Sequence, residues 1–239
     1  MMLLIDAGNS RVKWGVWQDG HWLAQGATGN GQLAELAAAW RGLPLAGAWG
    51  ACVAADEVRS VLEAQLGRPI HWVSTQVEGG GVRNHYHAPA QMGVDRWLSV
   101  LAARRLCGDD LVVACAGTAL TIESLTREGD YLGGLIMPGY ALMLTAMARN
   151  TARLDQPVGS WTDFPRCTED AIASGVLEAM VGAIERARHK LAAHTGRALP
   201  TLFVTGGDAT RIGPQLASPA RIVDNLVLLG LLEVADKSS

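Results

Sequence analysis

Three short turns that follow strand-like runs combine small residues with a hydroxyl, amide or carboxyl side chain, at residues 6–10, 116–118 and 205–208. Such turns let backbone N–H groups approach an anion, because no bulky side chain stands in the way. Asp6 in the first turn would repel a triphosphate unless Mg²⁺ lay between them, and Lys13 could neutralise phosphate charge. The first turn alone is equally compatible with an ordinary hairpin, but the three together indicate a two-lobed nucleotide site.

A carboxylate and a guanidinium stand side by side at Asp95 and Arg96, within an expected helix. One interpretation is a structural ion pair. The other is a carboxylate that accepts a hydroxyl proton in phosphoryl transfer, with Arg96 holding an anionic group of the substrate. His85 and His87 flank Tyr86 and could suggest a metal site, but two histidines in a loop more often lie on the surface.

Composition narrows the classes of protein that the chain can belong to. Its 239 residues suit one large domain or two lobes, and the net charge of −3, without a basic run, argues against a nucleic-acid partner. Four cysteines without a CxxC pair suggest free thiols in a reducing compartment. The N-terminus lacks the charged region of a signal peptide, and no apolar run reaches about 18 residues, so we expect a cytoplasmic protein with no membrane span. The chain contains neither the GxxxxGK[ST] motif of P-loop proteins nor the helix-opening GxGxxG motif of Rossmann folds, which argues against these two kinds of nucleotide site.

The elements that must position these residues follow an α/β order. A β-meander is expected over residues 3–27, with the pair Asp19 and Gly20 as its hairpin turn. Further expected elements are helices over 32–40, 56–66 (capped by Asp56 and closed by Gly67) and 91–106, strands over 45–54 and 70–73, and a surface loop over 76–88.

The second half restarts this pattern, which indicates an internal repeat. Strands are expected over 111–118, 119–125 and from Tyr131 onward, followed by a helix over 140–149. Thr168 is expected to cap a long helix that reaches about residue 194. A strand over 202–205, a strand over 221–224 and a closing helix over 226–236 complete two similar lobes, over residues 1–107 and 108–239.

The ordered motifs of the chain resemble those of type III pantothenate kinases. The resemblance is carried by residues 6–13, Tyr86, residues 93–96, residues 117–121 and residues 133–139, and it continues through Thr168 to Ile172 and residues 205–208. It covers essentially the whole chain, and the ordered set is far more specific than any single motif. It implies the acetate and sugar kinase/Hsp70/actin fold, with two duplicated ribonuclease H-like lobes and ATP in the cleft between them.

The resemblance also implies an activity: ATP-dependent phosphorylation of pantothenate to 4′-phosphopantothenate, the first step toward coenzyme A. It gives Asp95 the role of proton acceptor and makes Asp6 a metal-linked residue, through phosphate-bound Mg²⁺. The second lobe would carry the other phosphate turn, an adenosine turn and the helix of a homodimer. The residues implied to bind ATP are Asp6, Ala7, Gly8, Asn9, Ser10, Arg11, Val12, Lys13 and Thr118. Those implied to bind pantothenate are Tyr86, Gly93, Val94, Asp95, Arg96 and Thr168, the last across the dimer interface.

The chain departs from the family pattern at Cys115, where the family places an aspartate associated with a bound K⁺ or NH₄⁺ ion. A thiol is a poor ligand for a hard cation, which puts the monovalent-cation site in question here, and full activity with it. Two alternative functions stay open: a family member that acts as a transcriptional accessory factor or regulator, and a kinase for another small molecule on the same fold. The presence of Asp6, Lys13, Asp95 and Arg96 argues against the first.

Overall fold

The computed structural model describes residues 1–150 and 157–236, which fall into two compact units. The first unit comprises residues 1–105 with the segment from Asn225 onward, and the second comprises residues 106–224. The predicted lobe 108–239 therefore differs from the structure in its last helix. This helix, α7 (Leu226–Asp236), packs on strands of the first unit, because its apolar residues cover the face of that sheet around β1 and β4.

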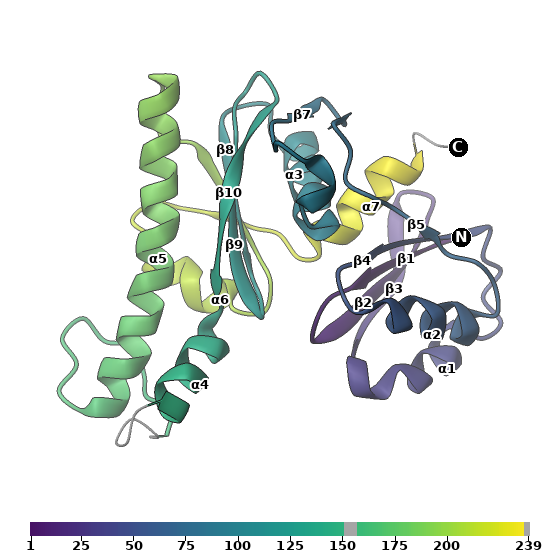
Figure 1. The fold of residues 1–239 in the computed structure, drawn as a ribbon, viewed down its shortest axis with the longest axis horizontal. Coiled ribbons are helices and arrows are strands. Elements are labelled where there is room, and N and C mark those ends of the chain that lie inside the picture. Colours follow the sequence, from purple (N-terminus) through teal and green to yellow (C-terminus); the bar gives the residue numbers. More distant parts are fainter. Residues whose placement is uncertain (151–156, 237–239) are drawn as a thin grey trace. The chain divides into compact units, whose positions relative to one another are not determined.

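The first unit is built on a five-stranded sheet in the order β3-β2-β1-β4-β5 (Figure 1). Its strands are β1 (Met2–Ala7), β2 (Arg11–Gln18), β3 (His21–Gly29), β4 (Gly47–Cys52) and β5 (His71–Trp72). The first three form the predicted antiparallel meander, and β4 and β5 continue the sheet in parallel. Asp19 and Gly20 have φ angles of 48° and 84°, which confirms the predicted hairpin turn.

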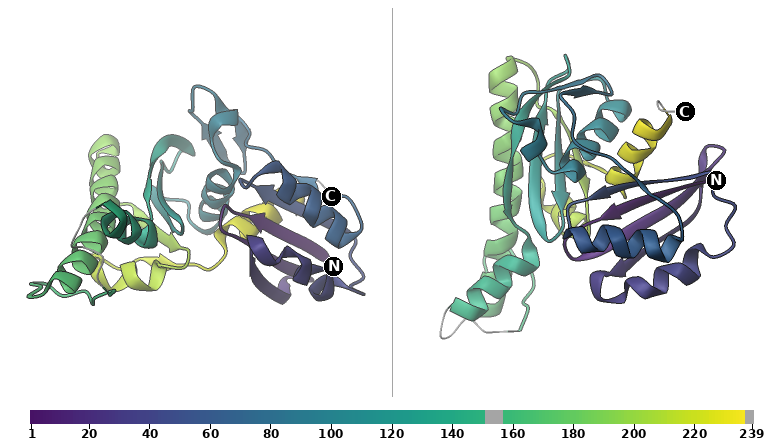
Figure 2. Two further views of the ribbon diagram at one scale, coloured as in Figure 1. Left: turned by 60° about the horizontal axis from the view of Figure 1, so that its bottom comes forward. Right: turned by 45° about the vertical axis from the view of Figure 1, so that its right-hand side comes forward.

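Two helices cover one face of this sheet: α1 (Leu36–Trp40) and α2 (Asp56–Leu66) (Figures 1 and 2). Leu3, Ile5 and Val16 of the sheet are fully buried against them. The predicted helix over 32–40 begins instead as a 3₁₀ segment, Asn30–Glu35, in which Gln32 is non-helical. The prediction of Asp56 as the cap of α2 was wrong, because Asp56 is already helical and Ala55 is the N-cap.

The segment between β5 and the next helix contains two short paired strands, β6 (Glu78–Gly79) and β7 (Val82–Asn84), so the prediction of a loop over 76–88 was wrong there. Gly80 and Gly81, which both have positive φ, join these strands. A 3₁₀ turn, Pro89–Gln91, then leads to α3 (Val94–Leu106). The predicted helix over 91–106 is interrupted at its start because Met92 is extended.

The second unit repeats the architecture of the first. Its strands are β8 (Leu111–Ala116), β9 (Ala119–Leu125), β10 (Asp130–Pro138), β11 (Thr201–Thr205) and β12 (Arg221–Ile222). They run in the order β10-β9-β8-β11-β12, with the first three antiparallel and the last two parallel to β8. In both units the order is thus third, second, first, fourth, fifth, which confirms the predicted internal repeat.

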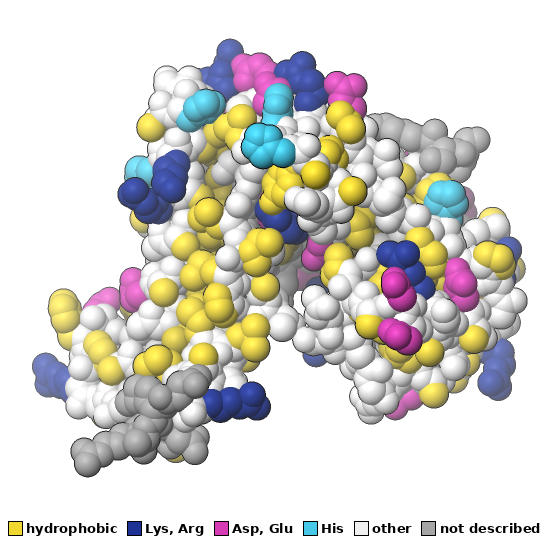
Figure 3. All heavy atoms as spheres, in the orientation of Figure 1, with side chains coloured by type: hydrophobic (Ala, Val, Ile, Leu, Met, Phe, Trp, Pro, Cys, Tyr) yellow, Lys and Arg dark blue, Asp and Glu magenta, His cyan; other side chains and the backbone are white. Residues whose placement is uncertain are grey.

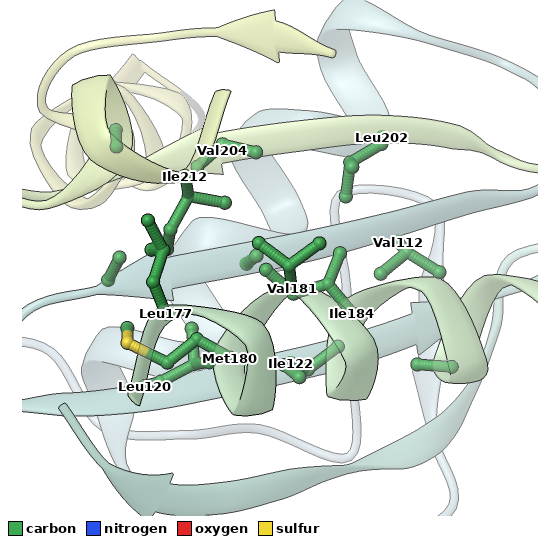
Figure 4. Close-up of a cluster of buried hydrophobic side chains, with 14 of the residues drawn as sticks. Val112, Leu120, Ile122, Leu177, Met180, Val181, Ile184, Leu202, Val204 and Ile212 are labelled. Carbon is green, nitrogen blue, oxygen red and sulfur yellow. The ribbon is translucent and has the colours of Figure 1, made fainter. Parts of the chain in front are cut away.

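The helices of the second unit are α4 (Tyr140–Asn150), α5 (Thr168–Thr195) and α6 (Ala209–Ile212), with a 3₁₀ turn at Gly213–Gln215. Helix α5 lies along one face of the sheet, where Met180 and Ile184 pack against Ile122 and Val204 (Figure 4). Cys167 occupies the N-cap of α5, so the prediction of Thr168 as the cap was off by one residue. Among the described residues, no helix combines the length and apolarity needed to cross a membrane.

Candidate active site

Asp6 and Lys13 face each other across the first two strands, because the antiparallel register pairs them directly. Side chains at such positions have Cβ atoms about 5 Å apart and interact. Burial raises the pKa of the Asp6 carboxyl to about 7, while the Lys13 ammonium lowers it and the Asp95 carboxylate raises it. The structure therefore brings both Lys13 and Asp95 within electrostatic reach of Asp6, although Asp95 is distant from Asp6 in the sequence.

The turn after β1 lies at the carboxyl end of that strand, where parallel α/β sheets commonly bind ligands. The Gly8 N–H donates to the Arg11 carbonyl at 3.1 Å and closes the turn. Asn9, Ser10 and Arg11 are exposed, whereas Ala7 and Val12 are fully buried. Of the predicted ATP-binding residues, Ala7 and Val12 thus present no surface to a ligand, whereas Asn9, Ser10 and Arg11 do.

Asp95 lies in the first turn of α3, where the helix dipole stabilises negative charge. Its Oδ1 atom lies 2.6 Å from the position that a Cβ atom on Gly93 would occupy. The same glycine approaches Val53, immediately after β4, which places the start of α3 at the carboxyl end of that strand. Glycine at residue 93 therefore lets the Asp95 carboxylate keep its present position, from which an added Cβ would displace it.

Tyr86 and Arg96 form a second polar pair in the same unit. The Arg96 Nη1 atom donates a hydrogen bond to the Tyr86 hydroxyl at 2.9 Å, and the Arg96 residue is only 4% exposed. Asn84 supports this arrangement, because its Oδ1 accepts the Tyr86 N–H at 3.0 Å and its Nδ2 donates to the Gln76 carbonyl at 3.2 Å. A buried guanidinium held in this way can bind an anionic group.

In the second unit, two of the predicted turns lie against each other at the ends of neighbouring strands. The Asp208 N–H donates to the Ala116 carbonyl at 3.2 Å, and Gly206 adopts a φ of 98° at a position where a Cβ atom would clash with the Ala116 backbone. The Gly139 N–H donates to the Thr118 carbonyl at 2.9 Å. The strand-end turn that contains Thr118 is thus assembled from three separate segments of the chain.

The two remaining predicted site residues, Cys115 and Thr168, also belong to the second unit. Cys115 is partly buried near the end of β8, opposite Thr121 of β9. Thr168 is exposed at the first position of α5. No disulfide joins any of the four cysteines, all of which lie in described segments. Within residues 1–150 and 157–236, no three histidine, cysteine or acidic side chains group as a metal site, His85 and His87 included.

Two asparagines at the site were not predicted from the sequence: Asn84, which holds Tyr86, and Asn30, which contacts the turn at residues 8–10. Asn84 stands in the predicted surface loop over 76–88, and Asn30 stands between the predicted meander and the predicted helix over 32–40. An asparagine in a polar segment carries no distinguishing sequence pattern. The roles of these two residues depend on tertiary contacts, which the sequence does not show.

The duplicated sheets, with glycine-containing turns at equivalent strand ends, define a protein of the actin-like kinase fold. A Campylobacter jejuni structure described as a Baf family transcriptional activator has a TM-score of 0.67 and is 23% identical, covering 99% of this chain and 98% of that one. A Sinorhizobium meliloti structure described as a 2-dehydro-3-deoxygalactonokinase has a TM-score of 0.64 at 15% identity, covering 100% and 99%. At these identities the likeness concerns the fold alone.

Sequence comparison identifies the family. The model of the type III pantothenate kinase family matches residues 2–190. A type III pantothenate kinase from Chromobacterium violaceum is 58% identical, covering 99% of this chain and 100% of the relative. That of Dechloromonas aromatica is 42% identical, covering 100% of both. The chain therefore belongs to the type III pantothenate kinase family.

Proposed function

We propose that this chain transfers the γ-phosphoryl group of ATP to the hydroxyl of pantothenate, which yields 4′-phosphopantothenate and ADP and begins coenzyme A synthesis. The observation that carries the proposal is the convergence of Asp6, Lys13 and Asp95 in one unit of a family member. A cytoplasmic location is part of this proposal, because the reaction consumes ATP.

Asp95 acts as the base in the proposed reaction. It accepts the proton of the substrate hydroxyl while the hydroxyl oxygen bonds to the γ-phosphorus, and the bond from that phosphorus to the leaving ADP oxygen breaks. Its fixed position supports this role, since a base must lie within hydrogen-bond reach of the proton that it accepts. The Arg96 backbone N–H donates to Asp95 Oδ1 at 2.9 Å and helps to hold the carboxylate in place.

Arg96 and Tyr86, with Gly93 and Val94, bind pantothenate in this proposal. Pantothenate is a carboxylate, and a guanidinium is the side chain best suited to pair with one. The hydrogen bond between Arg96 and Tyr86 supports the assignment, because it presents the buried cation in a single orientation.

Residues 6–13 and Thr118 bind ATP in this proposal, and Lys13 offsets phosphate charge. Mg²⁺ is usually held by one or two carboxylates together with the phosphates, and the partly buried Asp6 carboxylate fits that donor set. When bound, Mg²⁺ supplies positive charge that neutralises the phosphate oxygens. The Cys115 thiol does not fit a bound K⁺ or NH₄⁺ ion, so no step here involves one.

A homodimer is also proposed, formed through an apolar groove between α4 and α5. The groove has a volume of about 470 Å³ and is lined by residues that include Met143, Met147, Ile172 and Gly175. Ile136 on the neighbouring β10 is 65% exposed, and hydrophobic side chains gather on this face (Figure 3). Thr168 begins the same helix α5, which supports its proposed contact with pantothenate across a dimer interface.

Light scattering on purified protein tests the dimer. Ile172→Glu places a charge in the groove and should give monomers with little pantothenate-dependent turnover. The control Leu199→Glu alters an exposed leucine beyond the far end of α5 and should leave the dimer intact. A monomeric wild-type protein with full turnover would refute the dimer.

The kinase proposal is tested by measuring ADP release with ATP and Mg²⁺, in the presence and absence of pantothenate. The alternative of a transcriptional accessory factor predicts weak or no pantothenate-dependent release. The likeness to the Campylobacter jejuni structure does not favour this alternative, because at 23% identity it concerns only the fold.

A further inference from the structure

Asn30 lies just beyond β3 and makes three hydrogen bonds to the turn that follows β1. Its side-chain Nδ2 atom donates to the Gly8 carbonyl at 3.0 Å and to the Asn9 carbonyl at 3.0 Å. Its backbone N–H donates to the Ser10 carbonyl at 3.2 Å. Three successive carbonyl groups of the turn are thus directed at one residue.

The direction of these carbonyl groups fixes the direction of the N–H groups that follow them. A trans peptide unit is planar, and its C=O and N–H bonds point in opposite directions. No cis peptide occurs in the described segments. Because the Gly8 and Asn9 carbonyls both point to Asn30 Nδ2, the N–H groups of Asn9 and Ser10 point away from it. Successive N–H groups directed to one side form a concave site for anions.

The remaining polar atom of the Asn30 side chain supports this interpretation. Its Oδ1 atom is buried and has no hydrogen-bond partner among the described residues. Burying an acceptor without a donor is destabilising. The presence of an amide at residue 30 is therefore not explained by hydrogen bonds that satisfy all of its polar atoms. What the amide contributes is its pair of donors, both of which act on the turn.

We propose that Asn30 is a positioning residue for nucleotide binding: it orients the turn so that the N–H groups of Asn9 and Ser10 face a phosphate group of ATP. This inference rests on the proposed kinase function. Asn30 does not itself contact the nucleotide in this arrangement. The ligand of the turn is a polyphosphate anion. Asn30 therefore affects the binding of the nucleotide and not the binding of pantothenate.

The test combines calorimetric ADP binding with steady-state kinetics of Asn30→Leu, Asn30→Ser and the control Gln25→Ala. Leucine has a similar size and no donor, whereas serine keeps one donor. Gln25 is an exposed amide on the preceding strand β3, so its loss should change nothing. We expect Asn30→Leu to weaken ADP binding and raise the KM for ATP about tenfold, the effect of losing one charge-assisted hydrogen bond. Asn30→Ser should be intermediate.

The KM for pantothenate and the melting temperature separate positioning from a structural role. The inference requires both to stay near their wild-type values while nucleotide affinity falls. Unchanged ADP affinity in folded Asn30→Leu and Asn30→Ser, or an equal loss of affinity for both substrates, would overturn it. A wild-type protein that binds ADP without pantothenate-dependent turnover would refute the proposed function instead, and the ADP affinities would still decide the role of Asn30.

Discussion

Arg96 Nη1 donates a hydrogen bond of 2.9 Å to the hydroxyl oxygen of Tyr86, ten residues earlier in the chain. The bond joins α3 to the segment before it and orients a guanidinium that is almost completely buried. A residue that the sequence marks as a possible anion ligand, Arg96, is thus held by one that it marks only through a family resemblance, Tyr86, and the pair presents an oriented positive charge suited to an anionic substrate.

Tyr86→Phe should weaken pantothenate binding. Removal of the hydroxyl removes the acceptor that orients Arg96, so we expect the KM for pantothenate to rise about tenfold, in line with the loss of one hydrogen bond to a charged group. The KM for ATP is the internal control and should not change. Equal increases in both KM values would contradict a role specific to pantothenate.

Asp95→Asn should lower kcat by about 10²–10⁴-fold, the usual contribution of a general base. Asparagine keeps the shape of the side chain, so the melting temperature should stay close to that of the wild type. Asp109→Asn is the matched control, because Asp109 is an exposed aspartate. A fully active Asp95→Asn variant would remove the assignment of Asp95 as base.

Gly93→Ala should reduce kcat without abolishing folding. The added methyl group would lie 2.6 Å from the present position of Asp95 Oδ1, so the carboxylate must move. A displacement of about 1 Å at a catalytic group can cost about 10²-fold in rate. Gly182→Ala, at an exposed position of α5 with open space around the glycine, should have wild-type kcat. Retention of full kcat by Gly93→Ala would show that Asp95 tolerates the shift.

Asp110→Asn should destabilise the second unit in a pH-dependent way. Hydrogen bonds from the Arg197 guanidinium, at 2.8 and 2.7 Å, are the main cause that lowers the pKa of Asp110. A lowered pKa stabilises the folded state above the unfolded pKa of about 4, and this stabilisation is lost as the pH falls through the folded pKa.

Thermal unfolding between pH 7 and pH 2 measures this contribution. At pH 7 we expect Asp110→Asn to lose about 2 kcal/mol, the value of hydrogen bonds to a charged group. The difference from wild type should begin to shrink below about pH 4, where the Asp110 carboxyl of the unfolded chain becomes protonated, and should be lost as the pH falls through the lower pKa of the folded state. The exposed neighbour Asp109, changed to Asn, is the control. A difference that is the same at pH 7 and pH 2 would contradict the electrostatic origin.

Cys115→Asp should make activity more dependent on K⁺. A carboxylate oxygen suits a hard cation, whereas the thiol does not. The measurement is pantothenate-dependent ADP release in K⁺ compared with Na⁺, for the variant and for wild type. The same ratio of rates in both proteins would count against a cation site at this position.

The repeat of the fold could be predicted from the sequence because the pattern of strand runs and turns recurs in both halves. The hairpin at Asp19 and Gly20 was equally predictable, since both residues accept positive φ. The place of α7 could not be predicted. Its apolar character marks a buried helix, but nothing in the sequence states which sheet buries it.

The candidate site was predictable to the extent that its residues fall in motifs. Asp6 and Lys13 both fall in the first motif, within the predicted meander, and the antiparallel register of its first two strands pairs them directly. The approach of Asp95 to Asp6 and the hydrogen bonds of Asn30 could not be foreseen, because they depend on contacts between segments distant in the sequence. Local propensity carries no information about such contacts.

The measurement that tests the kinase assignment most directly is ADP release by the purified wild-type protein with ATP and Mg²⁺, with and without pantothenate, in K⁺ and in Na⁺. If Asp6, Lys13, Asp95 and Arg96 form a pantothenate kinase site, ADP release should increase strongly on addition of pantothenate, and 4′-phosphopantothenate should form in equal amount. If pantothenate-dependent ADP release were absent both in K⁺ and in Na⁺, the assignment would be contradicted.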